Sequence, residues 1–295
     1  MSEPGTLPAS RPWAGIAVSP GAASFAPLLF AGRLEEAVQT ASSLGLDCLE
    51  LSVRDPSALD AGNVRELLDG ADLRCSAVAT GQACLADGLC LSAGDEAARE
   101  AAVARFEAQV ALAGELGAAV IMGGVRGSLG ARREGAEARR RAAVEAMRAC
   151  VASAAEHGVS VLLEPINRYE TDFVNRCEEG LELLDELGAT GTALLLDTFH
   201  MNIEERDLAA AIRTAGERLG YVHMVDSNRY APGAGHVDFD AVLEALREIS
   251  YDGPLVAEIL PHPSDHAAAA AAAAFLSRAL EGTPAAKVAG ATEAG

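Results

Sequence analysis

Lysine is almost absent from this sequence of 295 residues, in which Lys287, near the C-terminus, is the only one. The positive charge comes from arginine, and 43 acidic residues against 23 basic ones give a formal net charge of −20. Without a lysine inside the expected fold, Schiff-base chemistry is excluded, and with it one class of aldolase mechanism. The acidic balance argues against extended contact with nucleic-acid phosphates or an anionic membrane, although a local basic site could still bind a small anionic substrate.

Aromatic residues are also scarce, at 4%, whereas half of the residues are hydrophobic. We therefore expect a core of Leu, Val, Ile and Ala. No apolar run approaches the length of a membrane span. The N-terminal stretch MSEPGTLPASRPW lacks the basic-then-apolar pattern of a signal peptide. These absences predict a cytoplasmic protein that has neither a nucleic acid nor a membrane as its partner.

The six cysteines, at positions 48, 75, 84, 90, 150 and 177, form no CxxC pair. Cys48, Cys75 and Cys150 fall among apolar residues of expected strands or helices. We interpret these three as small buried hydrophobes in a reducing compartment.

Short apolar runs alternate with stretches of helical periodicity along nearly the whole chain. Eight runs are typical of buried parallel strands, at residues 15–19, 48–53, 75–80, 118–122, 159–163, 193–196, 221–225 and 254–259. Eight such units predict an α/β fold, a single-domain (β/α)8 TIM barrel over residues 14–281. Residues 1–13 would be an N-terminal arm and 282–295 a disordered tail. An open doubly wound sheet is the alternative, disfavoured because no glycine-rich phosphate loop follows the first run.

Ionisable residues stand at or beside the ends of the last four expected strands. Glu164, Asp197, His223 and Glu258 each lie about one strand–helix step from the next. Each alone is explained by a helix cap or an ion pair, but four in register would share one rim of the barrel. Buried carboxylates this close need a cation to offset their repulsion. Mostly oxygen ligands suit Mn²⁺, Mg²⁺ or Co²⁺ better than structural zinc, so we predict a divalent-metal site.

A second polar set follows the same strands. Glu170 comes after the fifth, His200 after the sixth, and Asn228 and Arg229 after the seventh. These side chains could be a solvated rim, but their common face favours contacts with a neutral polyol or a keto sugar. After His200, residues 204–218 read as one helix.

Several motifs carry a resemblance to a known family: EPINRYE at 164–170, LDTFHMNIEE at 196–205, HMVDSNR at 223–229 and the glutamate of the eighth strand. Together they resemble the sugar isomerase and epimerase branch of the xylose isomerase-like barrels. The likeness is greatest to the ketose 3-epimerases that act on D-tagatose or D-allulose, and to 5-keto-L-gluconate epimerase. VRDPS, TGQACLADGLCLS and GGVRG, in the N-terminal half, resemble the keto-gluconate enzyme in particular.

The resemblance implies a role for each matching residue. Glu164, Asp197, His223 and Glu258 would bind the metal, usually Mn²⁺ in this family, and Glu164 and Glu258 would double as the acid/base pair. Glu170, His200 and Arg229 would hold the oxygens around the ketone. The implied activity is epimerisation of a keto sugar or keto-sugar acid of the 5-keto-L-gluconate or D-tagaturonate type, or of a ketose at C3.

This chemistry agrees with the expected geometry. Epimerising a carbon beside a ketone requires removal of its proton, an enediolate, and reprotonation on the opposite face, so two bases are needed. Glutamates on the fifth and eighth strands can lie on the two sides of a substrate. A keto-uronate would also need a cation for its carboxylate, for which the candidates are Arg54 and Arg126 at the ends of the second and fourth strands. His236 is expected only to order the loop after the seventh strand.

Three alternatives remain open. An aldose–ketose or hydroxypyruvate-type isomerase would use the same metal and enediolate. An abasic-site DNA endonuclease can share this barrel, but six histidines are few for a three-metal cluster and the net charge opposes DNA. A non-catalytic sugar-binding barrel is the third. A homo-oligomer is possible, with the apolar last helix as a surface.

Overall fold

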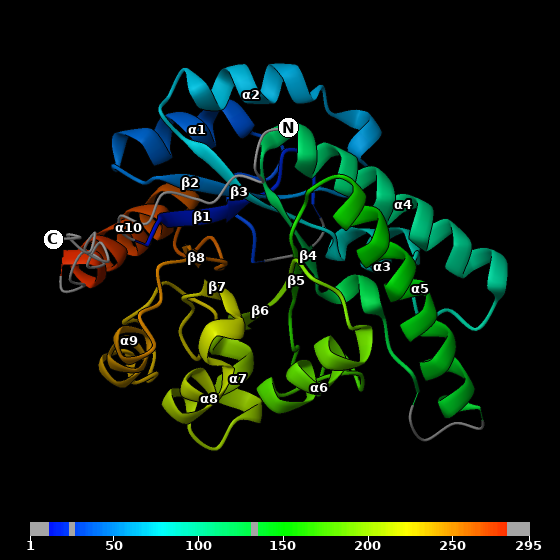
Figure 1. The fold of residues 1–295 in the computed structure, drawn as a ribbon. Coiled ribbons are helices and arrows are strands. Elements are labelled where there is room, and N and C mark those ends of the chain that lie inside the picture. The colour runs from blue at the N-terminus through cyan, green and yellow to red at the C-terminus, as the bar shows by residue number, and fades with distance from the viewer. Residues whose placement is uncertain (1–11, 24–26, 131–134, 282–295) are drawn as a thin grey trace, which may run out of the picture.

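The computed structural model of the chain describes residues 12–23, 27–130 and 135–281. Within them, eight parallel strands form a closed barrel in chain order, in which β1 pairs with β8 (Figure 1). The expected barrel is confirmed, and its closure rules out the open doubly wound sheet. The strands are β1 Ala14–Val18, β2 Cys48–Ser52, β3 Arg74–Ala79, β4 Ala119–Met122, β5 Val161–Leu163, β6 Thr192–Asp197, β7 Leu219–His223 and β8 Leu255–Ala257.

Helices surround the barrel (Figure 1). The α-helices are α1 Leu34–Ser43, α2 Ala61–Asp69, α3 Gly81–Asp87, α4 Glu96–Leu116, α5 Ala136–Glu156, α6 Cys177–Leu187, α7 Thr198–Glu204, α8 Leu208–Ala215, α9 Phe239–Glu248 and α10 Asp265–Glu281. Short 3-10 turns η1 Pro56–Ala58, η2 Gly124–Arg126 and η3 Gly216–Arg218 complete the connections. Of the two flanking segments predicted, 1–13 lies outside the described residues except for its last two positions, and 282–295 lies wholly outside them.

The core has two parts, as the alternation along each strand requires. Outward-facing side chains such as Leu49 and Leu51 pack against the helices. Inward-facing ones, among them Ala17, Cys48 and Ala77, fill the barrel itself. The interior is therefore a packed core, and a cavity can open only where the strands end.

The expected strands are all present, but two helical regions differ from the prediction. The single helix predicted at 204–218 is wrong: α7 begins at Thr198, and Glu205, in extended conformation, separates it from α8. The early start follows from Asp197, whose side chain accepts the backbone N–H groups of Phe199 and His200. The short helix α3 was not predicted, because seven residues are too few to show a helical period.

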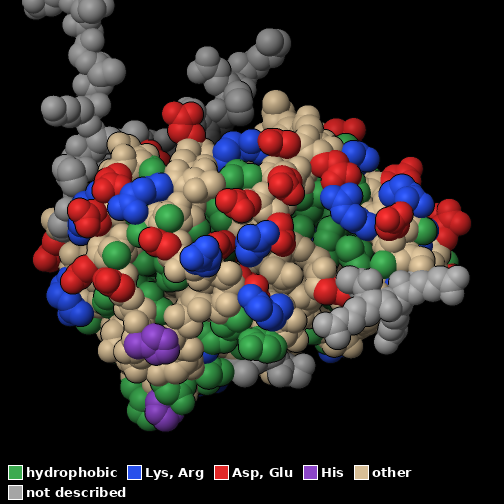
Figure 2. Space-filling view, turned by 90° about the horizontal axis from the view of Figure 1, so that it is seen from below, with side chains coloured by type: hydrophobic (Ala, Val, Ile, Leu, Met, Phe, Trp, Pro, Cys, Tyr) green, Lys and Arg blue, Asp and Glu red, His purple; other side chains and the backbone are tan. Residues whose placement is uncertain are grey.

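The surface agrees with the composition. In the part of the chain that the structure describes, no helix is long and apolar enough to cross a membrane. On the face seen in Figure 2, arginines are interspersed with acidic side chains and form no continuous basic patch. That face therefore presents no strip of positive charge (Figure 2).

The cysteines fall into two groups. Cys48, Cys75 and Cys150 are buried, as predicted, and Cys177 is buried with them. Burial raises the pKa of the Cys48 thiol to about 12. Cys84 and Cys90, for which no pairing was predicted, form a disulfide that spans the end of α3.

Candidate active site

Four side chains meet at the C-terminal end of the barrel. Glu164 directly follows β5, Asp197 and His223 end β6 and β7, and Glu258 directly follows β8. One potential ligand atom from each lies within 4.8 Å of the others. Parallel barrel strands all end at one rim. Residues that are a whole strand–helix unit apart in the sequence therefore lie close together in space.

The cluster contains two buried polar atoms without a hydrogen-bond partner, Asp197 Oδ2 and His223 Nδ1. They lie 3.4 Å apart, and His223 Nδ1 lies 3.7 Å from Glu164 Oε1. A buried polar atom without a partner lowers the stability of the folded state. A divalent cation bound among these atoms would supply the missing partner. Three carboxylates and one imidazole fit Mn²⁺, Mg²⁺ or Co²⁺ in charge and in ligand type.

Asp197 has two separate contacts. Its Oδ1 caps α7, at 2.7 Å from Phe199 N and 3.1 Å from His200 N, while Oδ2 faces the cluster. Next to it, the Thr198 hydroxyl donates to the carbonyl of Val225 at 2.6 Å. The cap and this bond to the segment after β7 fix the orientation of Asp197. The simple view of Asp197 as a helix cap and the view of it as a ligand are therefore compatible.

Burial raises the pKa of both glutamates of the cluster. Removal from water raises the pKa of Glu164, and raises that of Glu258 to about 8 although Arg229 and His223 oppose the change. Burial also disfavours ionisation of Asp197, but His200 and Arg229 outweigh it and hold the pKa of that carboxyl well below its ordinary value. The site thus separates one carboxyl whose pKa is lowered, Asp197, from two whose pKa is raised, Glu164 and Glu258.

The buried ring of His200 lies between two donor side chains, Asn167 and Arg229. The amide nitrogen of Asn167 lies 2.8 Å from Glu170 Oε1 and 2.8 Å from His200 Nδ1. Since a carboxylate only accepts, the amide donates one N–H to Glu170 and the other to His200 Nδ1. On the other side of the ring, Arg229 Nη1, which can only donate, lies 3.4 Å from His200 Nε2, so both ring nitrogens face donor groups. Burial lowers the pKa of His200 to about 3, which agrees with a neutral ring. Nε2 lies 3.8 Å from Glu164 Oε1, on the side of the cluster.

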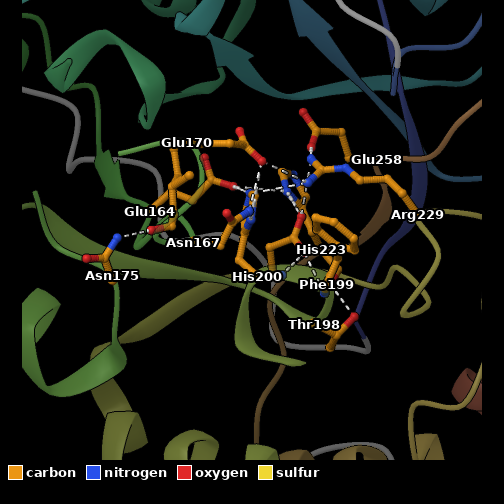
Figure 3. A network of polar contacts seen from close by, with 12 residues as sticks. Glu164, Asn167, Glu170, Asn175, Thr198, Phe199, His200, His223, Arg229 and Glu258 are labelled. Atoms are coloured by element: carbon orange, nitrogen blue, oxygen red, sulfur yellow. Dashed lines mark hydrogen bonds and ion pairs between the residues drawn. The ribbon is translucent and has the colours of Figure 1, made fainter. Parts of the chain in front are cut away.

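Arg229 completes this wall of the site (Figure 3). Its guanidinium pairs with the Glu258 carboxylate, lies 3.9 Å from Asp197 Oδ2, and has its central carbon 4.6 Å from the centre of the Phe199 ring. The residue has φ = 62°, in the left-handed region that is uncommon outside glycine. The turn after β7 therefore holds Arg229 in a strained conformation that directs its side chain to the cluster.

A cavity of about 280 Å³ lies over these residues. Glycine at position 123 leaves room for the Glu164 carboxylate, because a Cβ there would lie 2.3 Å from Glu164 Oε2 and displace it. Another part of the lining comes from α3 and the segment after it, including Leu85, which is 63% exposed, and the disulfide of Cys84 and Cys90. The volume is near the lower end for small-molecule sites and fits one small metabolite.

Neither arginine predicted to bind a substrate carboxylate lines this cavity. Arg54 is half exposed and pairs with Asp87 at the surface. Arg126 is fully buried and donates to backbone carbonyls, among them those of Met122, at 2.9 Å, and Glu164. It joins the end of β4 to the segment after β5. The sequence could not separate these arginines from Arg229, because all three follow strands and only side-chain direction distinguishes them.

Two other predicted residues belong to the loop after β7. Asn228 donates to the carbonyl of Ala234 at 2.8 Å, so it shapes the loop and does not line the cavity. His236 contacts the Ser227 hydroxyl at 2.8 Å, which agrees with the ordering role expected of it.

The sequence analysis missed two residues of the site. Asn167 is 2% exposed and joins Glu170 to His200; its position inside the motif EPINRYE was the available signal. Glu50, in β2, is fully buried and lies 2.7 Å from His223 through its Oε2. Its signal was an acidic residue within the otherwise apolar strand CLELS.

Comparison with known proteins gives the family. The family model described as "Xylose isomerase-like TIM barrel" matches residues 38–279. An L-ribulose 3-epimerase of a Methylomonas species is 35% identical over 237 residues, 77% of this chain and 79% of that protein. A D-psicose 3-epimerase of Enterocloster bolteae is 47% identical, but over only 96 residues, so the match covers about a third of either chain.

Among solved structures, a D-allulose 3-epimerase from Methylomonas superposes with a TM-score of 0.77 at 27% identity, covering 92% of this chain and 99% of that one. The barrel, the cluster at its C-terminal end and the extent of these matches lead to one conclusion. The chain belongs to the xylose isomerase-like TIM barrel family, within its sugar epimerase branch.

Proposed function

We propose that the protein is a divalent-metal-dependent epimerase that inverts the carbon next to the carbonyl of an uncharged ketose, at C3. The observation that carries this proposal is the pair Glu164 and Glu258, which reach one cluster from β5 and β8. Two proton-exchanging groups at one small cavity are what inversion through an enediolate requires. The relatives named L-ribulose, D-psicose and D-allulose 3-epimerases support the choice of C3.

In the proposed reaction, one glutamate removes the proton and the other returns one to the opposite face. Burial raises the pKa of both carboxyls, the direction that suits a group which must accept and return a proton. The guanidinium of Arg229 is a donor for the developing oxyanion, and the His200 ring beside it lies within reach of the same oxygens. A divalent metal held by Glu164, Asp197, His223 and Glu258, with Mn²⁺ first and Mg²⁺ or Co²⁺ as alternatives, would polarise the carbonyl and stabilise that negative charge.

The charge of the cavity favours an uncharged substrate over a keto-sugar acid. Arg229 is the only arginine among the described residues that line it, and it is paired with Glu258. A substrate carboxylate would lie near Glu164, Glu170 and Glu258 with no unpaired arginine to offset the repulsion. We therefore rank ketoses above keto-uronates of the 5-keto-L-gluconate type.

Proton NMR in D₂O tests the reaction, with the Mn²⁺-loaded enzyme, a panel of ketoses and keto-uronates, and removal of the metal before acquisition. Deuterium at C3 together with the C3 epimer is the expected result. Deuterium at the terminal carbon with an aldose would establish the isomerase alternative. Preferred turnover of a keto-uronate would contradict the ranking, and bound metal without exchange on any substrate would reject the proposal.

Single variants test the two-base assignment. Glu164→Gln and Glu258→Gln should each lower epimerisation by at least about 100-fold, since each removes one of two proton carriers. Each variant should still exchange deuterium into one epimer but not into the other, because one face keeps its base. Metal content is measured in parallel, since both residues belong to the ligand cluster, and Arg54→Ala is the control with full activity. Loss of exchange from both epimers in metal-loaded variants would contradict a two-base mechanism.

A further inference from the structure

Glu50 is an acidic residue in the interior of the barrel. It lies two residues after Cys48, whose side chain belongs to the inward-facing apolar cluster. Its neighbours in register on β1 and β3 are Ala17 and Ala77, whose small side chains leave room for it. A fully buried carboxylate among apolar groups is costly unless it is paired, so its partner needs an explanation.

The partner is a histidine of the cluster, on a strand that is not adjacent to β2 in the barrel. Glu50 Oε2 lies 2.7 Å from His223 Nε2. Since a carboxylate accepts, the Nε2 proton is donated to Glu50. A ring nitrogen that binds a metal must present its lone pair, and the Glu50 contact leaves Nδ1 for that purpose. Nδ1 is the atom that faces Asp197 Oδ2 and Glu164 Oε1 and has no hydrogen bond.

We propose that Glu50 is a positioning residue, which fixes the tautomer and the ring orientation of His223 so that Nδ1 binds the divalent metal. The inference rests on the proposed function only in that a metal occupies the cluster; it does not depend on the substrate. Glu50 also adds a fourth carboxylate beside Glu164, Asp197 and Glu258, which favours a divalent cation at this end of the barrel.

Metal affinity is the direct test, because it needs no turnover. Mn²⁺ binding to the full chain is measured by calorimetry with chelator competition for wild type, Glu50→Gln and Glu50→Leu. Carboxylate partners of metal-bound histidines typically contribute 10- to 100-fold in affinity. We expect a loss of about that size in Glu50→Leu and a smaller one in Glu50→Gln, which keeps an oxygen acceptor but no charge.

Tyr251→Phe is the matched control for core disruption. Tyr251 is buried just before β8, at the opposite end of that strand from Glu258, and its hydroxyl donates to the carbonyl of Pro254 at 2.7 Å. This variant should unfold more easily but bind Mn²⁺ like wild type. The visible spectrum of the Co²⁺-loaded proteins is a second measurement. It should shift in the Glu50 variants, in which the His223 ring is reoriented, and not in Tyr251→Phe.

The outcomes separate this inference from the proposed function. Affinities within twofold of wild type in both Glu50 variants, or an equal loss in Tyr251→Phe, would overturn the role of Glu50. Failure of wild type to bind any divalent cation would overturn it as well. Weakened metal binding in the Glu50 variants of a protein that epimerises no ketose would uphold the inference and reject the proposed function.

Discussion

At the scale of single residues, position relative to the cavity decides which arginine can act in the reaction. Arg54, Arg126 and Arg229 all follow barrel strands. Arg229 is 8% exposed and lies over the cluster, Arg126 is buried among backbone carbonyls, and Arg54 lies at the surface. An arginine that only bonds carbonyls organises the backbone, whereas one that lines the cavity can meet a substrate.

This difference gives a prediction for a pair of matched variants. Arg229→Met should lower kcat/KM for the preferred ketose by about 100-fold or more, because it removes a donor at the developing oxyanion. The same change also leaves Glu258 without its partner. Arg54→Met removes an equal charge at an exposed ion pair and should change kcat/KM less than twofold. Steady-state kinetics on both variants checks this, and an equal effect at the two positions would contradict the assignment.

At the scale of elements, the loop after β7 depends on one buried aspartate. Asp226 accepts the backbone N–H groups of Ser227 at 2.7 Å, Gly233 at 2.8 Å and Val237 at 3.2 Å. Burial opposes its ionisation, but these bonds prevail and lower the pKa of the Asp226 carboxyl. Asp226 also accepts from Arg229 N through its backbone carbonyl, at 2.8 Å. The geometry of the loop that carries Arg229 is thus tied to one charge.

Replacement of this charge should cost stability in a pH-dependent way. Asp226→Asn should lower the free energy of unfolding at pH 7 by about 2 kcal/mol, the scale of hydrogen bonds to a charged group. Because the folded-state pKa is lowered, the contribution is fully present above the ordinary value of 3.8 and disappears as the pH falls through the folded-state value. The difference between wild type and variant should therefore shrink below about pH 4.

Denaturant unfolding at several pH values measures this difference. Asp252→Asn, at an exposed position, is the control and should change stability by less than about 0.5 kcal/mol at any pH. A deficit in Asp226→Asn that stayed constant down to pH 2 would show that the charge of Asp226 is not its source.

At the scale of the whole molecule, metal binding should stabilise the fold, because the cluster joins the ends of four strands from β5 to β8. A cation that binds the folded state alone at 100 times its Kd contributes about 2.7 kcal/mol. Protein treated with EDTA should therefore gain several degrees in Tm when Mn²⁺ is added.

The net charge of −20 makes a control essential, since acidic surfaces also attract cations. Asp197→Asn keeps an oxygen that can cap α7 but removes the charge that faces the cluster. The variant should lose the Mn²⁺-dependent rise in Tm. A rise equal to that of wild type would mean that the ion binds elsewhere.

The sequence alone determined the barrel and the identity of the clustered residues. Apolar runs at regular intervals specify buried strands, and parallel strands in one barrel must end at one rim. Glu164, Asp197, His223 and Glu258 could therefore be placed together before any coordinates were known. Both inferences need only the periodicity of apolar residues and the topology of the barrel. The first can be read from a single sequence, and the second follows from the fold.

Only the tertiary structure decided which side chains face one another. The Glu50–His223 pair joins strands separated by β1 and β8, and no pattern along the chain encodes a contact across the barrel interior. The directions of Arg54 and Arg126 likewise depend on packing after closure. The helix predicted at 204–218 is broken at Glu205, which is extended, and α8 begins after Asp207, whose side chain caps it; periodicity reveals neither feature. Periodicity indicates which residues are buried. Function depends on the directions of side chains and the distances between them, and these are fixed only when the barrel closes.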